Sequence, residues 1–243
     1  MLPKIEHPIH EIELISIGKT VKFRPFLVKE EKILLMALES NEERTMIDAI
    51  KQIIQNCIIE PTDFNLNEVA VYDLELFFLK LRAYSMGEIV ETKYTCQNVV
   101  EGGNRCGHLM DVSINLLDVK MTGNVENKIV KFNENVGVKM NHPNITSLQK
   151  ITEINLLDDP KNVINFIYDC MEYVFDNNQI YSKEEVSREE FTEFIENMSK
   201  AEFAKFENYF MSLPKVQHLI EKTCERCNFD HKIVLEGIGD FFE

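Results

Sequence analysis

The feature that most constrains this chain is a pair of cysteine-containing stretches with a shared pattern. The first is Cys96–His108 and the second is Cys224–His231. Each follows a threonine at the end of a strand-like run, and alternating apolar residues follow each. Zn²⁺ accepts four thiolates in a closed tetrahedral site. The pattern therefore predicts one structural zinc that ties the middle of the chain to its C-terminal part, with the ligands Cys96, Cys106, Cys224 and Cys227.

The spacing of the cysteines differs between the two stretches. Cys224 and Cys227 have the usual spacing of a zinc knuckle, whereas Cys96 and Cys106 lie further apart. We interpret the longer spacing as an expanded loop, because Gly102-Gly103 lets the chain turn sharply. The alternatives are four reduced thiols, or a closed site that has lost part of its metal. Disulfides are disfavoured because nothing in the sequence indicates export.

Two histidines next to the cysteines are alternative ligands. His108 and His231 end the two stretches, although the interpretation that we favour for both is a polar residue flanking the knuckle. A catalytic zinc keeps an open coordination position and needs a nearby acid or base. The sequence shows no candidate for such an acid or base, so the predicted zinc is structural.

Charge and composition exclude several classes of function. The formal net charge of −15 argues against a nucleic-acid-binding protein, because phosphate contacts need a basic face. No apolar run approaches the length of a membrane span, and the first residues lack the basic-then-apolar pattern of a signal peptide. Six cysteines without an export signal are typical of a reducing cytosol. Cys57 and Cys170 lie within apolar helical patterns and are predicted to be core residues.

Hydrophobic periodicity predicts an α+β fold with an N-terminal β-hairpin, a predominantly helical core and a two-knuckle, four-cysteine, zinc-ribbon-like β element joining the middle and the C-terminus. Strands are expected over 11–15, 19–23, 88–95, 108–116, twice within 128–139, and over 215–222. Helices are expected over 28–39, up to 58, 69–83, 147–154 and 162–175, with two more beginning after Ser187 and Ser199. We divide the chain into regions 1–87, 88–118, 119–186 and 187–243, within one continuous globular unit.

A search for catalytic groups finds no nucleophile with a base and no glycine-rich phosphate-binding loop. The paired carboxylates Asp158-Asp159, Glu184-Glu185 and Glu189-Glu190 lie next to helix starts, where acidic residues are expected. Ser187 to Glu190 and Ser199 to Glu202 both read as capping boxes. We therefore predict no catalytic residue and no small-molecule substrate. An enzyme whose site is assembled from scattered residues stays open as the alternative.

Candidate partner-binding residues come from two places in the chain. Phe206 and Phe210 recur at helical spacing, which favours a place in the core, and anchoring of a partner protein is the alternative. Arg24 and Phe26 flank Pro25 after the hairpin. They are candidates for an interaction surface, although we favour a role in bracing the hairpin on the first helix.

The chain resembles the baseplate hub and hub-assembly proteins of T-even-type contractile-tailed bacteriophages. An ordered set of blocks, rather than any single motif, carries the resemblance over nearly the whole chain. The blocks are 16–35, 73–88, the cysteines Cys96 and Cys106, 167–173, 187–191, and a last one that includes Pro214, His218, Cys224, Cys227 and the stretch 235–242. One departure is Asn228 after the last cysteine, where glycine is commoner in a knuckle.

The resemblance implies a non-enzymatic role. A member of this family would be a component of the baseplate hub, which forms before the wedges join, or a factor that helps the hub to assemble. It would work by docking onto other hub proteins, in the host cytoplasm during assembly and in the baseplate of the virion tail. The resemblance identifies no catalytic residue.

Overall fold

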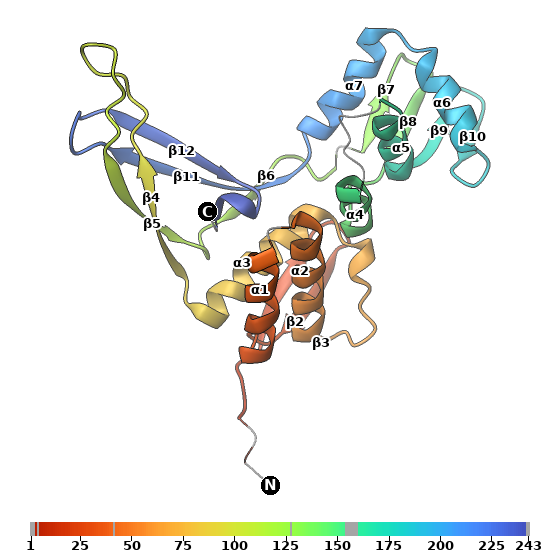
Figure 1. The fold of residues 1–243 in the computed structure, drawn as a ribbon. Coiled ribbons are helices and arrows are strands. Elements are labelled where there is room, and N and C mark those ends of the chain that lie inside the picture. Colours follow the sequence, from red (N-terminus) through yellow and green to blue (C-terminus); the bar gives the residue numbers. More distant parts are fainter. Residues whose placement is uncertain (1–2, 4, 41, 127, 154–159, 242–243) are drawn as a thin grey trace.

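The computed structural model describes residues 3, 5–40, 42–126, 128–153 and 160–241 (Figure 1). The helices within these ranges are α1 (Val28–Ser40), α2 (Glu43–Cys57), α3 (Val71–Met86), α4 (Ile145–Glu153), α5 (Pro160–Cys170), α6 (Arg188–Glu196) and α7 (Lys200–Met211), with the 3₁₀ helices η1 (Leu66–Glu68) and η2 (Gly239–Phe241). The strands are β1 (His10–Leu14), β2 (Lys19–Phe23), β3 (Ile58–Glu60), β4 (Ile89–Thr95), β5 (Leu109–Asn115), β6 (Lys120–Thr122), β7 (Ile129–Lys131), β8 (Gly137–Met140), β9 (Met171–Phe175), β10 (Ile180–Ser182), β11 (Lys215–Thr223) and β12 (Asp230–Glu236). The fold is mixed α and β, and the strand pairs in the described ranges are antiparallel.

The N-terminal lobe combines the sheet β1-β2-β3 with helices α1, α2 and α3. Alternating residues form the β1–β2 hairpin, and Gly18 at its turn has φ +61°, a left-handed conformation that glycine adopts without a steric cost. Helix α3 is apolar nearly all round and lies inside this lobe, where Phe77, Phe78 and Leu79 are at most 1% exposed. This core extends to Ile114 of β5 and Val216 of β11, so the cysteine-bearing hairpins are packed onto the lobe at their bases.

A second lobe, formed by the middle of the chain, is built from the sheet β10-β9-β8-β7 and helices α5, α6 and α7 (Figure 1). Its core is separate from the first and includes Ile167, Phe191 and Phe206. Helices α6 and α7 each begin with the predicted capping box, in which the serine accepts a hydrogen bond from the backbone N–H of the glutamate and the glutamate accepts one from the serine N–H. Both predicted helix starts are therefore confirmed.

One predicted helix is too long. The residues from Met171 to Phe175 form β9, whereas the pattern predicted a continuous helix over 162–175. Short apolar runs fit both periodicities, and Tyr173, Val174 and Phe175 favour a strand. Strands β8 and β10 pair with β9 on its two sides and satisfy its backbone hydrogen bonds. Helix α4 matches the prediction over 147–154 except for its last residue, which lies outside the described residues.

Two long hairpins carry the cysteines. Strands β4 and β5 pair from Ile89↔Asn115 to Thr95↔Leu109, and β11 and β12 pair from Gln217↔Glu236 to Thr223↔Asp230. In Figure 1 the hairpins lie side by side and extend away from the helices, and β6 joins the base of β11. The loops at their far ends share a small buried cluster of Cys96, Cys106, Met110 and Cys224. The fold therefore brings together two loops that are far apart in the sequence.

Candidate metal centre

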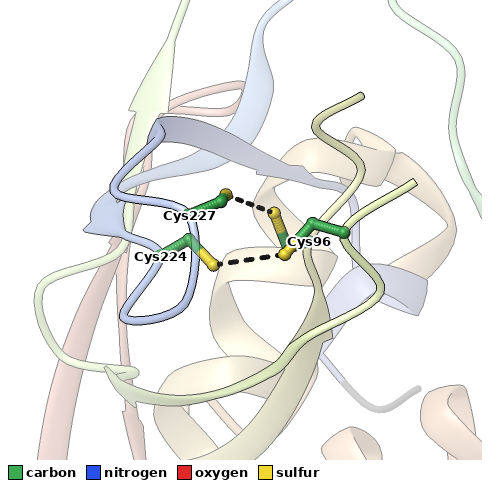
Figure 2. Close-up of side chains that lie close together, drawn as sticks. Cys96, Cys224 and Cys227 are labelled. Atoms are coloured by element: carbon green, nitrogen blue, oxygen red, sulfur yellow. Dashed lines mark hydrogen bonds between the residues drawn. The ribbon is translucent and has the colours of Figure 1, made fainter. Parts of the chain in front are cut away.

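The four predicted ligands lie in these two loops. Cys96 and Cys106 belong to the loop between β4 and β5, and Cys224 and Cys227 belong to the loop between β11 and β12. All four sulfur atoms lie within 4.8 Å of one another. Cys96 Sγ is 3.6 Å from Cys227 Sγ, and Cys106 Sγ is 3.9 Å from Cys224 Sγ. Figure 2 shows cysteine side chains from the two loops pointing toward one another.

The two loops share a backbone pattern despite their different lengths. The N–H of Cys224 donates to the Phe229 carbonyl, and the N–H of Asn228 donates back to the Cys224 carbonyl, both at 2.8 Å. In the longer loop Cys96 N–H donates to the His108 carbonyl at 2.8 Å, and Gly107 N–H donates to the Cys96 carbonyl at 3.1 Å. These are the same two bonds at corresponding positions.

The residue after the second cysteine of each loop has a positive φ. Gly107 has φ +63° and Asn228 has φ +55°. Asparagine is one of the few residues besides glycine that adopt this conformation readily. The departure from the usual glycine at position 228 is therefore compatible with the turn.

The extra residues of the longer loop form a small insertion between its two cysteines. Cys106 N–H donates to the Asn98 carbonyl at 2.8 Å, Val100 N–H donates to the Asn104 carbonyl at 2.9 Å, and an isolated bridge joins Val99 and Arg105. Gly102 and Gly103, both at positive φ, form the turn of this insertion. The loop is thus a short turn with a side hairpin added, as the paired glycines predicted.

The sulfur positions fit a tetrahedral tetrathiolate site. A Zn–S bond of about 2.3 Å places the sulfurs of such a site about 3.8 Å apart, close to the two separations given above. A disulfide needs sulfurs about 2.0 Å apart, and the four cysteines are free. The donor set, four sulfurs from two loops, is the one that structural zinc sites use. These residues can therefore hold one divalent ion.

The ionisation behaviour of the cysteines also favours a bound cation between the four sulfurs. Burial raises the pKa of the Cys96 thiol to about 12, because a buried thiolate without an opposite charge is poorly solvated. The pKa of Cys227 is lowered to about 6: burial opposes ionisation, but hydrogen bonds from Asn98 and from the Phe229 backbone favour the thiolate. A bound divalent ion would supply the positive charge that all four sulfurs need in order to ionise.

Backbone amides in both loops point at the sulfurs. The N–H of Asn98 donates to Cys96, that of His108 to Cys106 and that of Phe229 to Cys227. Each donor lies two residues after the cysteine that it contacts. Hydrogen bonds of this kind favour the ionised sulfur, so the turn geometry itself prepares the site for a cation.

The candidate partner-binding residues lie elsewhere. Arg24 donates to both carboxylate oxygens of Glu30, to the Pro25 carbonyl and to the Asn56 carbonyl at 2.9–3.4 Å, which joins the end of β2 to α1 and α2. Phe26 is buried in the first core, and its N–H donates to Ser85 Oγ.

The two phenylalanines of α7 lie in or against the second core. Phe206 is fully buried beside Phe132, and Phe210 is half-buried beside Phe166. The Phe206 side chain is therefore not at the surface of the lobe.

The paired carboxylates have structural surroundings where they are described. Glu190 belongs to the capping box of α6, and Glu185 accepts hydrogen bonds from the N–H and hydroxyl of Ser182. The pair Asp158-Asp159 lies outside the described residues. No helix in the described ranges is long and apolar enough to cross a membrane.

Two further side chains contact sulfur at the site, and sequence reasoning had singled out only one of them. Asn98 Nδ2 donates to Cys227 Sγ at 3.5 Å, and His231 Nε2 lies 3.1 Å from Cys96 Sγ. His231 had been noted as an alternative ligand but interpreted as a flanking residue. Its burial was predictable, because it shares the inward face of β12 with Ile233 in a strict alternation.

Comparison with known proteins identifies the family. Residues 7–243 match the family described as T4 bacteriophage base plate protein. Neither a search of curated proteins nor a search of solved structures found a match. Because the family match covers nearly the whole chain, the protein belongs to the T4 bacteriophage base plate protein family.

Proposed function

We propose that the protein is a structural subunit of the phage baseplate hub or a factor that assembles the hub. The observation that carries this proposal is the family match over residues 7–243. Membership of that family indicates a structural baseplate role and contacts with other baseplate proteins. One member of each described carboxylate pair has a structural role, since Glu190 caps α6 and Glu185 accepts hydrogen bonds from Ser182. These roles support a non-enzymatic function.

The proposal includes a structural zinc held by Cys96, Cys106, Cys224 and Cys227. Bound there, the ion supplies a permanent cross-link between the ends of two hairpins. Because the cross-link would close a loop of more than a hundred residues, it would restrict the unfolded chain strongly. The hairpins leave the body of the molecule side by side (Figure 1), so the cross-link would hold them as one rigid arm.

A rigid arm suits a protein that works by docking. A fixed surface loses little conformational freedom on binding, and this preorganisation favours affinity. The formal charge of −15 favours partners with basic surfaces and disfavours nucleic acid. Phe210 remains a candidate contact, because its side chain is only partly buried within the lobe. The protein would act in the host cytoplasm during assembly, and a hub subunit would also be present in the tail of the finished virion.

Quantitative mass spectrometry of purified virions and isolated hub intermediates tests this function. Proteins of the wedge serve as the control, because hub intermediates isolated before the wedges join lack them. Stoichiometric presence in both preparations is the result expected of a hub subunit, whereas presence in the intermediates alone identifies an assembly factor. Absence from both preparations contradicts the proposal.

A further inference from the structure

Two side chains, one from each hairpin, contact a cysteine sulfur of the opposite hairpin. Asn98 belongs to the β4–β5 loop and donates through Nδ2 to Cys227 of the other hairpin at 3.5 Å. His231 belongs to β12, and its Nε2 lies 3.1 Å from Cys96 of the first hairpin. The contacts are reciprocal, because each hairpin places one side-chain donor against one sulfur of its neighbour.

The position of His231 is fixed on several sides. Its side chain is only 7% exposed, and the rings of Tyr94 and Phe229 meet it edge-on at centroid distances of 5.6 and 4.8 Å. A buried imidazole needs a hydrogen-bond partner. A metal-bound thiolate is an acceptor only, so the tautomer that satisfies both groups carries its proton on Nε2.

We propose that Asn98 and His231 are positioning residues of the metal centre, each donating a hydrogen bond to a metal-bound thiolate on the opposite hairpin. This inference rests on the proposed zinc. Four thiolates and one Zn²⁺ carry a net charge of about −2, since each ligand must be deprotonated. In a buried site that charge has to be offset by nearby donors, and outer partners of this kind orient and tune metal ligands.

A third side chain also joins the two cysteine loops. Arg226, between the two cysteines of the shorter loop, donates through its guanidinium to the Cys106 carbonyl at 3.2 Å. The two loops therefore meet through direct hydrogen bonds as well as through the sulfurs. We infer that ion and donors act together, so that removal of one donor weakens metal binding and exposes one particular sulfur to reaction.

The experiment compares purified full-length wild type with His231→Phe, His231→Gln and Asn98→Ala. His231→Phe keeps a ring between Tyr94 and Phe229 but removes the donor, whereas His231→Gln retains an N–H near the position of Nε2. His7→Phe is the matched control, because His7 is an exposed histidine before β1 and does not belong to the site. Zn²⁺ affinity is measured by competition with a chromophoric chelator. The rate at which iodoacetamide alkylates each cysteine is measured by peptide mass spectrometry.

The expected result is a 10–100-fold loss of Zn²⁺ affinity in His231→Phe, as found for outer partners of metal ligands. Alkylation should accelerate at Cys96 in His231→Phe and at Cys227 in Asn98→Ala, because a thiolate that loses a hydrogen bond is more nucleophilic. His231→Gln should recover most of the affinity, and His7→Phe should behave as wild type. If circular dichroism shows that His231→Phe does not fold, the alkylation rates of the cysteines in Asn98→Ala test the proposal instead.

Three results overturn the inference or its basis, and they can be told apart. Wild type that binds no Zn²⁺ removes the proposed metal itself. Zinc-binding wild type with unchanged affinity and alkylation in the variants removes the role of the two donors. A Co²⁺ absorption spectrum typical of three sulfurs and one nitrogen in the wild type, replaced by a four-sulfur spectrum in His231→Phe, would make His231 a ligand rather than a donor.

Discussion

Replacing Phe206 by alanine should destabilise the second lobe by about 4 kcal/mol. Its side chain is fully buried, with ring contacts to Phe132 at 5.4 Å and to Phe203 at 6.4 Å. Phe→Ala substitutions in cores cost about 3–5 kcal/mol through lost burial and the cavity left behind. The ring contacts are part of what is lost, and about 4 kcal/mol is the middle of that range. The melting temperature should fall by about 8–16 °C, at about 2–4 °C per kcal/mol for a chain of this size.

Urea unfolding followed by far-ultraviolet circular dichroism measures the effect, since the chain has no tryptophan to report by fluorescence. Met211→Ala is the matched control: it lies on the same helix, is 74% exposed, and should change the free energy of unfolding by less than about 0.5 kcal/mol. A Phe206→Ala variant that loses less than about 1 kcal/mol, or no more than Met211→Ala, would refute the packing argument for this lobe. Loss of partner binding with unchanged stability would identify Phe206 as an interface residue instead.

Three further predictions concern the N-terminal lobe and the metal centre. Arg24→Ala should cost about 3 kcal/mol in urea unfolding at neutral pH, because it leaves the buried Glu30 carboxylate without its main partner; a cost below about 1 kcal/mol would argue against it. Burial acts to raise the pKa of Glu30, but Arg24 and the Leu27 N–H lower it below the ordinary value of 4.5. The ionised group therefore stabilises the fold above that value, and its contribution is lost as the pH falls through the lowered pKa; Arg24→Ala should flatten this pH dependence. Asn228→Gly should leave the melting temperature unchanged, whereas Asn228→Val should cost about 1–2 kcal/mol because its φ is positive; equal behaviour of the two variants would contradict the turn geometry. Cys224→Ser should abolish zinc binding and lower the melting temperature, while Cys170→Ala should keep the metal, and equal metal content in both would count against the shared site.

Local patterns predicted the elements well where one periodicity dominates. The β1–β2 hairpin and α3 follow from clear alternation and from a long apolar run, and the capping serines mark the starts of α6 and α7. The sequence of β9 was ambiguous, because its apolar residues fit both the periodicity of a helix and that of a strand. Only the neighbouring strands β8 and β10 decide between the two, and these pairings are not local in sequence.

The grouping of the four cysteines was predictable, but their surroundings were only partly so. Four cysteines in two turn-like stretches have few uses other than metal binding, and the fold brings them together. Glu30 shares one buried face of α1 with Leu34 and Ala37, and an acid on an apolar stripe is a signal of a buried ion pair that sequence reasoning overlooked. Asn98 offered no comparable signal, because it lies in an irregular loop whose path depends on the opposite hairpin.

The central structural claim is that the four cysteines share one zinc ion. Native mass spectrometry of the purified full-length protein, expressed without added metal and prepared under reducing conditions, tests it most directly. We expect a mass equal to the chain plus one zinc ion for the wild type, and the mass of the bare chain for Cys224→Ser. A folded and reduced wild-type protein with the mass of the bare chain would contradict the shared zinc site.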